Sequence, residues 1–172
     1  MKQGHLLVAF LFLMSLASCR KDTLSHGADY TRSYKAWQAF KASSNNAYRY
    51  LVATTSWTGY GTETVITVKN GKVVGRSYVA KLHANNGTGA VTVTAQWTED
   101  ETQLSTHQEG APALTLDAIY EQARTHWLLK RDDAKTYFEA KNNGMISSCG
   151  YVPNGCADDC FMGIHISLIE AI

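Results

Sequence analysis

The sequence predicts an α+β domain in which two helices pack on one face of an antiparallel β-sheet. Two segments, centred on Trp37 and Ile119, carry apolar residues at helical spacing. The segments between and after them alternate apolar and polar residues and are separated by short turn signals. The predicted order is helix, four strands, helix and then shorter strands (α-β-β-β-β-α-β-β), which suits an antiparallel sheet covered on one side.

The first predicted helix covers residues 30–42, with Asp29 as its N-cap. Alternating, β-branched residues predict strands at 48–55, 62–69 and 72–80. The dipeptide Asn70-Gly71 joins the last two of these strands. Because a tight hairpin turn needs positive φ at both central positions, this dipeptide predicts a β-hairpin.

A fourth strand is predicted from Val91 to Trp97, where apolar residues alternate with polar ones, and we expect its apolar face to be buried. Thr115 is the expected N-cap of the second helix, whose apolar stripe runs from Leu116 to Trp127. The remaining predicted elements are a loop at 99–112, a turn at 142–144 and short strands at 134–140, 145–148 and 161–169.

The N-terminus resembles a bacterial lipoprotein signal. Lys2 is followed by an apolar run at 6–13, too short to span a bilayer, and then by Leu16-Ala17-Ser18-Cys19. Signal peptidases have narrow sites, so they need small residues beside the bond that they cleave. The cysteine supplies the thiol that accepts lipid. We therefore predict that the signal peptide 1–18 is removed, that Cys19 carries acyl chains such as palmitate, and that 19–29 is a flexible tether to a single domain at 30–172. An ordinary secretory signal cleaved near Cys19 is the alternative.

Charge and the residues after Cys19 indicate where such a domain works. Arg20-Lys21-Asp22 places basic residues where an inner-membrane retention signal has an aspartate, which favours the outer membrane and leaves its periplasmic or surface face open. The net charge of the chain is +1, and removal of Lys2 with the signal brings it to about zero. A neutral domain has no surplus of basic residues with which to bind nucleic acid. Its predicted contact with the membrane is the lipid on Cys19.

Three further cysteines lie close together near the C-terminus. If Asn154-Gly155 forms a two-residue hairpin turn, Cys149 faces Cys160, and we predict a disulfide between them. Pro153 counts against that turn because it lacks an N–H, so a Cys149–Cys156 bridge is the competing prediction. A zinc site made with His165 is a weaker hypothesis because its ligand spacing is uncommon.

Other signs of chemistry are sparse. The sequence contains no familiar catalytic or nucleotide-binding motif, so no catalytic residue, metal site or cofactor is predicted. The adjacent pairs Asp132-Asp133 and Asp158-Asp159 are expected to face water in loops. Three tryptophans, Trp37, Trp97 and Trp127, lie on predicted apolar faces and are assigned to the core. Trp57 and Tyr60 lie in a predicted hairpin loop and are the expected exposed aromatic binding surface.

Several of these features together resemble an uncharacterised family of small bacterial lipoproteins and secreted domains, catalogued as a domain of unknown function. They are the Tyr48 and Tyr50 pair, the Asn70-Gly71-Lys72-Val73 turn, the second helix, Tyr137 before a glycine turn, and Asp158-Asp159. The chain departs from that family at Gly144-Met145-Ile146, where a Gly-Tyr-Pro turn is common. The resemblance implies a fold over nearly the whole mature chain and supplies no catalytic residues.

The function expected from the sequence is that of a lipid-anchored envelope protein, a non-enzymatic binding or structural module. Its expected partner is an envelope protein, a peptide or a glycan. One alternative is an inhibitor of an enzyme or host factor that acts through its hairpin loops around Trp57 and Tyr60. Another is a small envelope hydrolase or redox enzyme that uses Cys160, His165 or the acidic pairs.

Overall fold

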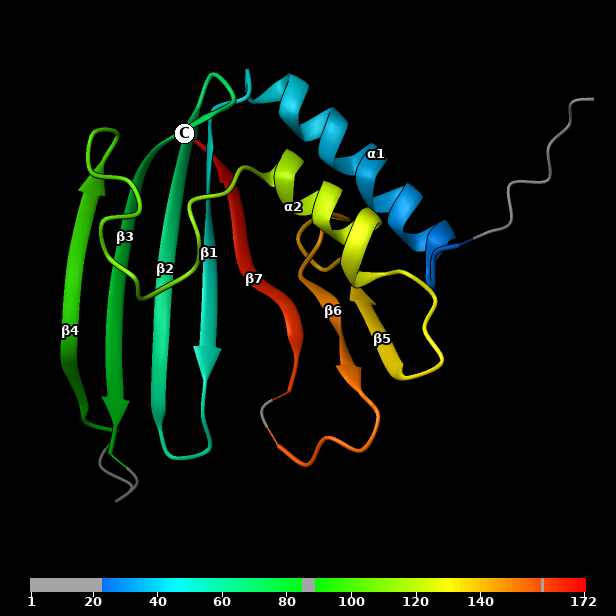
Figure 1. Cartoon of the computed structure of the whole chain (residues 1–172). Helices are drawn as coiled ribbons and strands as arrows, with labels where there is room; N and C mark the ends of the chain where they lie inside the picture. The colour runs from blue at the N-terminus through cyan, green and yellow to red at the C-terminus, as the bar shows by residue number, and fades with distance from the viewer. Residues whose placement is uncertain (1–22, 85–88, 159) are drawn as a thin grey trace, which may run out of the picture.

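The computed structural model describes residues 23–84, 89–158 and 160–172 (Figure 1). Seven strands form one sheet in the order β4-β3-β2-β1-β7-β6-β5, and each pair of neighbours is antiparallel. Two helices lie on one face of this sheet. The predicted α+β class is therefore confirmed. The predicted signal peptide and the lipidation site Cys19 lie outside the described residues.

The strands agree closely with the turn and alternation signals in the sequence. Their bounds are β1 Tyr48–Thr55, β2 Tyr60–Lys69, β3 Lys72–His83, β4 Val91–Asp100, β5 Ala134–Glu139, β6 Ser148–Pro153 and β7 Met162–Ala171. Three strands follow the second helix, near the three predicted ranges, although the predicted order counted only two. The range 145–148 is wrong, because it shares only Ser148 with β6. Asn70 and Gly71 have φ of 50° and 73°, so the predicted hairpin turn between β2 and β3 is confirmed.

The first helix, α1 (Gly27–Ser43), begins earlier than predicted. Asp29 is not its N-cap but lies in its first turn, where it binds Arg32. Residues 23–29, predicted to belong to a flexible tether, are instead part of the fold. Leu24 forms a β-bridge with Leu129, and the Ser25 N–H donates to the Leu128 oxygen at 2.7 Å. No helix in the described part of the chain is long and apolar enough to cross a membrane.

The second helix is α2 (Leu116–Gln122), which continues into a π-helical turn, η1 (Ala123–Trp127). The Thr115 hydroxyl accepts the Ala118 N–H at 3.2 Å, which confirms the predicted N-cap. At the other end, the Leu128 N–H donates to the Ala123 oxygen five residues back. Such wide turns are frequent at functional sites.

Aromatic residues hold the helices against the sheet. Trp37 of α1 is fully buried and meets Tyr48 of β1 edge to face at 5.1 Å. The Tyr48 hydroxyl accepts the Leu116 N–H at 2.9 Å, and the Tyr50 hydroxyl donates to the Leu114 oxygen at 2.6 Å. Burial raises the pKa of Tyr48 to about 12, so its hydroxyl stays neutral. Strand β1 thereby fixes where α2 begins.

The prediction that β4 buries its apolar face is wrong. Val91 and Val93 are 49% and 51% exposed. The reason is topological: β4 is an edge strand, and the helices lie over the opposite half of the sheet (Figure 1). Trp97 is only half-buried, whereas Trp37 lies in the core and Trp127 packs against it.

Candidate functional site

The sheet divides between β1 and β7. Their pairing runs from Tyr48 opposite Ala171 to Val52 opposite Ile166, with a bulge after Leu51. Strand β1 continues to Thr55 and β7 starts at Met162, but these ends are not paired with each other in the described structure. Figure 1 shows β7 bending away from β1 along this stretch. The result is a split in the sheet bounded by two strand ends.

A cleft of about 460 Å³ occupies this split and the adjacent helix-covered face. Strands β1 and β2 form one wall, β7 forms the other, and the α2–η1 segment with the loop at 110–114 forms the roof. Most lining side chains are apolar; the polar ones are Gln122, His165 and the threonines 54, 62 and 64. Among the described residues that line the cleft, none is Asp, Glu, Lys or Arg. Size and lining are those of a ligand site.

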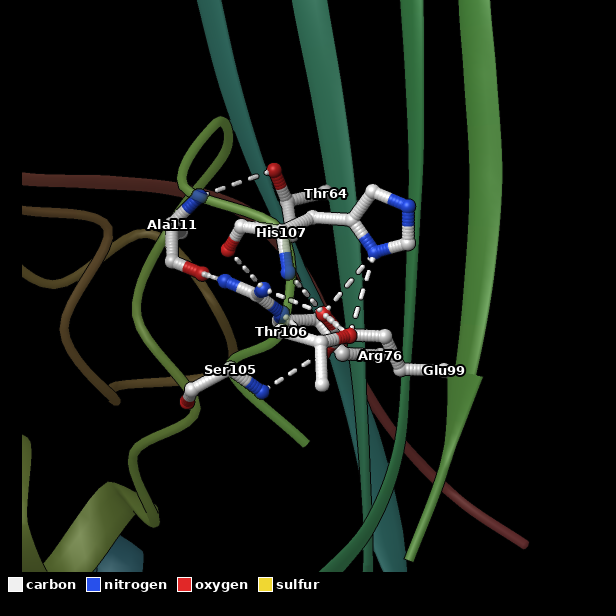
Figure 2. A network of polar contacts seen from close by, with 7 residues as sticks. All are labelled: Thr64, Arg76, Glu99, Ser105, Thr106, His107 and Ala111. Carbon is white, nitrogen blue, oxygen red and sulfur yellow. Dashed lines mark hydrogen bonds and ion pairs between the residues drawn. The ribbon is translucent and has the colours of Figure 1, made fainter. Parts of the chain in front are cut away.

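A buried ion pair fixes the loop that roofs this cleft (Figure 2). Arg76 of β3 and Glu99 of β4 form two hydrogen bonds of 2.8 Å each, and their side chains are 3% and 0% exposed. Glu99 also accepts the N–H groups of Ser105 and His107 at 2.9 and 2.7 Å. The Arg76 guanidinium, with these N–H groups, holds the pKa of Glu99 well below its ordinary value.

The same guanidinium connects the ion pair to the cleft. Arg76 donates to the carbonyl oxygens of His107 and Ala111 at 2.7 and 3.1 Å. The Ala111 N–H in turn donates to the buried Thr64 hydroxyl at 3.0 Å, and Thr64 and Ala111 both line the cleft. Gly110 has φ of +80°, and a Cβ there would lie 2.8 Å from the Thr64 hydroxyl oxygen. The loop is therefore anchored tightly against the sheet.

Sequence reasoning missed this network because it treated 99–112 as a solvated polar loop. A signal was present in the alternation of the strands. Arg76 and Glu99 occupy positions whose neighbours two residues along, Tyr78 and Trp97, face the same side of the sheet. Two opposite charges at facing positions on one side of neighbouring strands could have indicated a buried pair.

The predicted disulfides of Cys149 are both wrong. The structure pairs Cys156 with Cys160, whose Cα atoms are 6.3 Å apart, and leaves Cys149 as a buried thiol. The reason is the register: β6 and β7 pair Cys149 with Ile164, so their connection is longer than an Asn154-Gly155 turn. Cys160 consequently lies in the loop, while Cys149 faces the core.

The disulfide loop leads directly into one wall of the cleft. Phe161 follows Cys160, and its ring stacks on His165 with centroids 4.3 Å apart. Both rings line the cleft and also a second cavity of about 480 Å³ beside β5 and β6. The bridge between Cys156 and Cys160 limits the freedom of the chain just before Phe161 and so helps to place this shared wall.

The predicted aromatic binding surface lies apart from the cleft. Trp57 is 85% exposed and Tyr60 42%, so their expected exposure is confirmed, and their role as a binding surface stays a prediction. His165 stacks on Phe161, and the disulfide occupies Cys156 and Cys160, so the hypothetical zinc ligands are not brought together. No group of three or more His, Cys, Asp or Glu suited to a metal ion occurs in the described ranges.

Comparison of the chain with protein-family models, with curated proteins and with solved structures found no match. The functional proposal therefore rests on the geometry of the cleft.

Proposed function

We propose that this chain is a non-enzymatic binding module of the cell envelope, anchored by lipid on Cys19 at the outer membrane, and that its cleft holds an uncharged, largely apolar ligand. The observation that carries the proposal is the cleft of about 460 Å³ between β1 and β7, lined without Asp, Glu, Lys or Arg. A buried ion pair anchors the loop that forms its roof, and a disulfide limits the freedom of the chain just before Phe161. Preformed walls reduce the ordering cost of binding.

The state of the cysteines favours binding over catalysis. Burial raises the pKa of the Cys149 thiol to about 12, which keeps it protonated and poorly nucleophilic. Cys156 and Cys160 are bonded to each other, so neither offers a thiolate. The lipobox Leu16-Ala17-Ser18-Cys19 supports the anchor, and mass spectrometry of the native protein that finds no diacylglycerol on Cys19 would exclude it.

Binding can be tested with a neutral fluorescent probe such as N-phenyl-1-naphthylamine. The variant Gln122→Arg places a charge at an exposed lining position of α2 and is expected to weaken probe binding, because the cation must be desolvated against an apolar ligand. Thr125→Arg is the matched control: it makes the same substitution at an exposed position of η1 that does not line the cleft. Equal binding by the two variants would place the probe elsewhere and refute the proposal.

A further inference from the structure

Strand β4 is the outermost strand on one side of the sheet (Figure 1). It runs from Val91 to Asp100, and every residue from 91 to 96 is exposed. Natural proteins protect an edge of this kind from pairing with another chain, often with lysine or proline. Residues 91–98 include no proline and no charged residue. The outer edge of β4 is therefore suited to pairing with another strand.

The hydrogen bonds of β3 show which backbone groups of β4 point outward. The His83 N–H donates to the Gly59 oxygen, on the β2 side, at 2.9 Å. The Ala84 N–H donates to the Ala90 oxygen, on the β4 side, also at 2.9 Å. These directions alternate along an antiparallel strand, and β3 pairs regularly with β2 from 75 to 82, so residues 76, 78, 80 and 82 face β4. Their partners on β4 are Thr92, Ala95, Trp97 and Glu99. The β4 residues that direct their N–H and C=O outward are then Val91, Val93, Gln96 and Thr98.

A bulge gives these outward residues an unusual spacing. Ala80 pairs with Ala95 and Lys81 pairs with Val93, so Thr94 is an extra residue on β4. The outward positions 91, 93, 96 and 98 are consequently separated by two, three and two residues. This spacing is the same in both directions along the strand. An antiparallel second copy of β4 therefore places an outward residue opposite every outward residue, whereas a regular strand would match only one side of the bulge.

The side chains are compatible with the same register. Val91 lies opposite Thr98 of the second copy, and Val93 lies opposite Gln96 of the second copy. Val93 and Gln96 point to the same face of the sheet, because their partners on β3 are two residues apart. No pair brings like charges together, and the added strand covers part of Val91 and Val93, which are 49% and 51% exposed.

The opposite edge of the sheet is protected, so pairing through β4 does not continue into a filament. The Asn154 N–H donates to the Asp133 oxygen, which directs Asp133 toward β6 and, by alternation along β5, Thr136 outward. The His26 ring hydrogen-bonds to the outward Thr136 oxygen at 3.2 Å. A head-to-tail contact of β4 with β5 would propagate, whereas a contact of β4 with β4 is isologous and closes at two copies.

We infer that two copies of this chain pair through β4, antiparallel and with Val93 opposite Gln96, and join their seven-stranded sheets into one continuous sheet. The partner that fits this edge is a second copy because the spacing of its outward groups is its own complement. The inference concerns a different surface from the cleft and does not rest on the proposed function.

Sedimentation of the full chain in detergent tests the dimer, and wild type is expected to show a concentration-dependent equilibrium between monomer and dimer. Val93→Lys places a lysine of each copy beside the two-fold axis, and Gln96→Pro removes an outward donor from each copy. Each variant should weaken dimerisation at least about tenfold. Leu168→Lys is the matched control: it replaces a side chain of similar exposure, 43%, on β7 and should leave the dimer unchanged. Chemical unfolding establishes that each variant is folded.

Crosslinking tests the register. Val91→Cys mixed with Thr98→Cys should be joined by a short bifunctional thiol reagent, because the two positions lie opposite each other. Val91→Cys alone should not be joined, since its two cysteines would lie roughly 24 Å apart along the strands. Cys149 is buried, and Cys156 and Cys160 are bonded to each other, so the wild-type chain serves as the blank.

The outcomes divide as follows. A dimer that Val93→Lys and Gln96→Pro weaken, together with the crosslink between positions 91 and 98, supports the inference. A chain that stays monomeric at millimolar concentration, filaments of increasing mass, or a dimer that Leu168→Lys weakens as much as Val93→Lys would overturn it. A crosslink in Val91→Cys alone would also overturn it, because the strands would then pair in another register.

Discussion

Replacing Cys156 and Cys160 with serine should destabilise the domain by a predictable amount. The disulfide joins residues with a sequence separation of 4. For so short a loop the chain-entropy model gives a stabilisation of about 2 kcal/mol. Cys156 is exposed and Cys160 half-buried, so serines at these positions leave no core cavity. In a domain of this size that loss corresponds to a fall in Tm of about 4–8 °C.

Guanidinium unfolding with and without a reductant measures this effect. Wild-type protein in reductant should unfold like the double serine variant in either condition. Cys149→Ser serves as the control: it should destabilise the protein by placing a polar group in the core, and it should keep the sensitivity to reductant. Wild-type stability that does not respond to reductant, or a reductant response that disappears in Cys149→Ser alone, would refute the pairing of Cys156 with Cys160.

Three further outcomes can be checked by chemical unfolding. The pKa of Glu99 is lowered by Arg76, so the stability it contributes is present at neutral pH and is lost as the pH falls below the ordinary value of 4.5. Unfolding of Glu99→Gln measured from about pH 3 to 7 should show a flatter acid limb than wild type. Trp37→Ala should cost about 3–5 kcal/mol because Trp37 is fully buried, whereas Trp57→Ala should change stability by less than about 0.5 kcal/mol. Gly163→Ala should be strongly destabilising because its methyl group would collide with the carbonyl oxygen of Cys149, while at Gly75 the nearest atom would lie 3.5 Å away and alanine should be tolerated.

Local signals in the sequence were sufficient for several of the individual elements. Strand β1 has the predicted bounds, and the Asn70-Gly71 turn and the Thr115 cap are confirmed, because each depends on residues a few positions apart. The burial of β4 could not be predicted in the same way. Its alternation is that of a half-buried strand, but burial depends on its place in the sheet, which is set by pairings distant in sequence.

The candidate site shows the same division between local and long-range information. The sequence predicted a disulfide within the group Cys149, Cys156 and Cys160, but both predicted pairings used Cys149 and are wrong, because the partners depend on the length of the β6–β7 connection. The split between β1 and β7 joins residues more than a hundred positions apart and begins one residue pair beyond the bulge that follows Leu51. No local pattern in either strand marks that point.

The short ladder between β1 and β7 also has a mechanical consequence. In the described structure, the strands β4 to β1 and the strands β7 to β5 meet in the sheet only where residues 48–52 pair with residues 166–171. This junction is the natural hinge line for twisting one half of the sheet against the other, and the cleft lies at its open end. A ligand seated in the cleft would therefore restrict this twisting. Binding would then slow hydrogen exchange in strands far from the ligand.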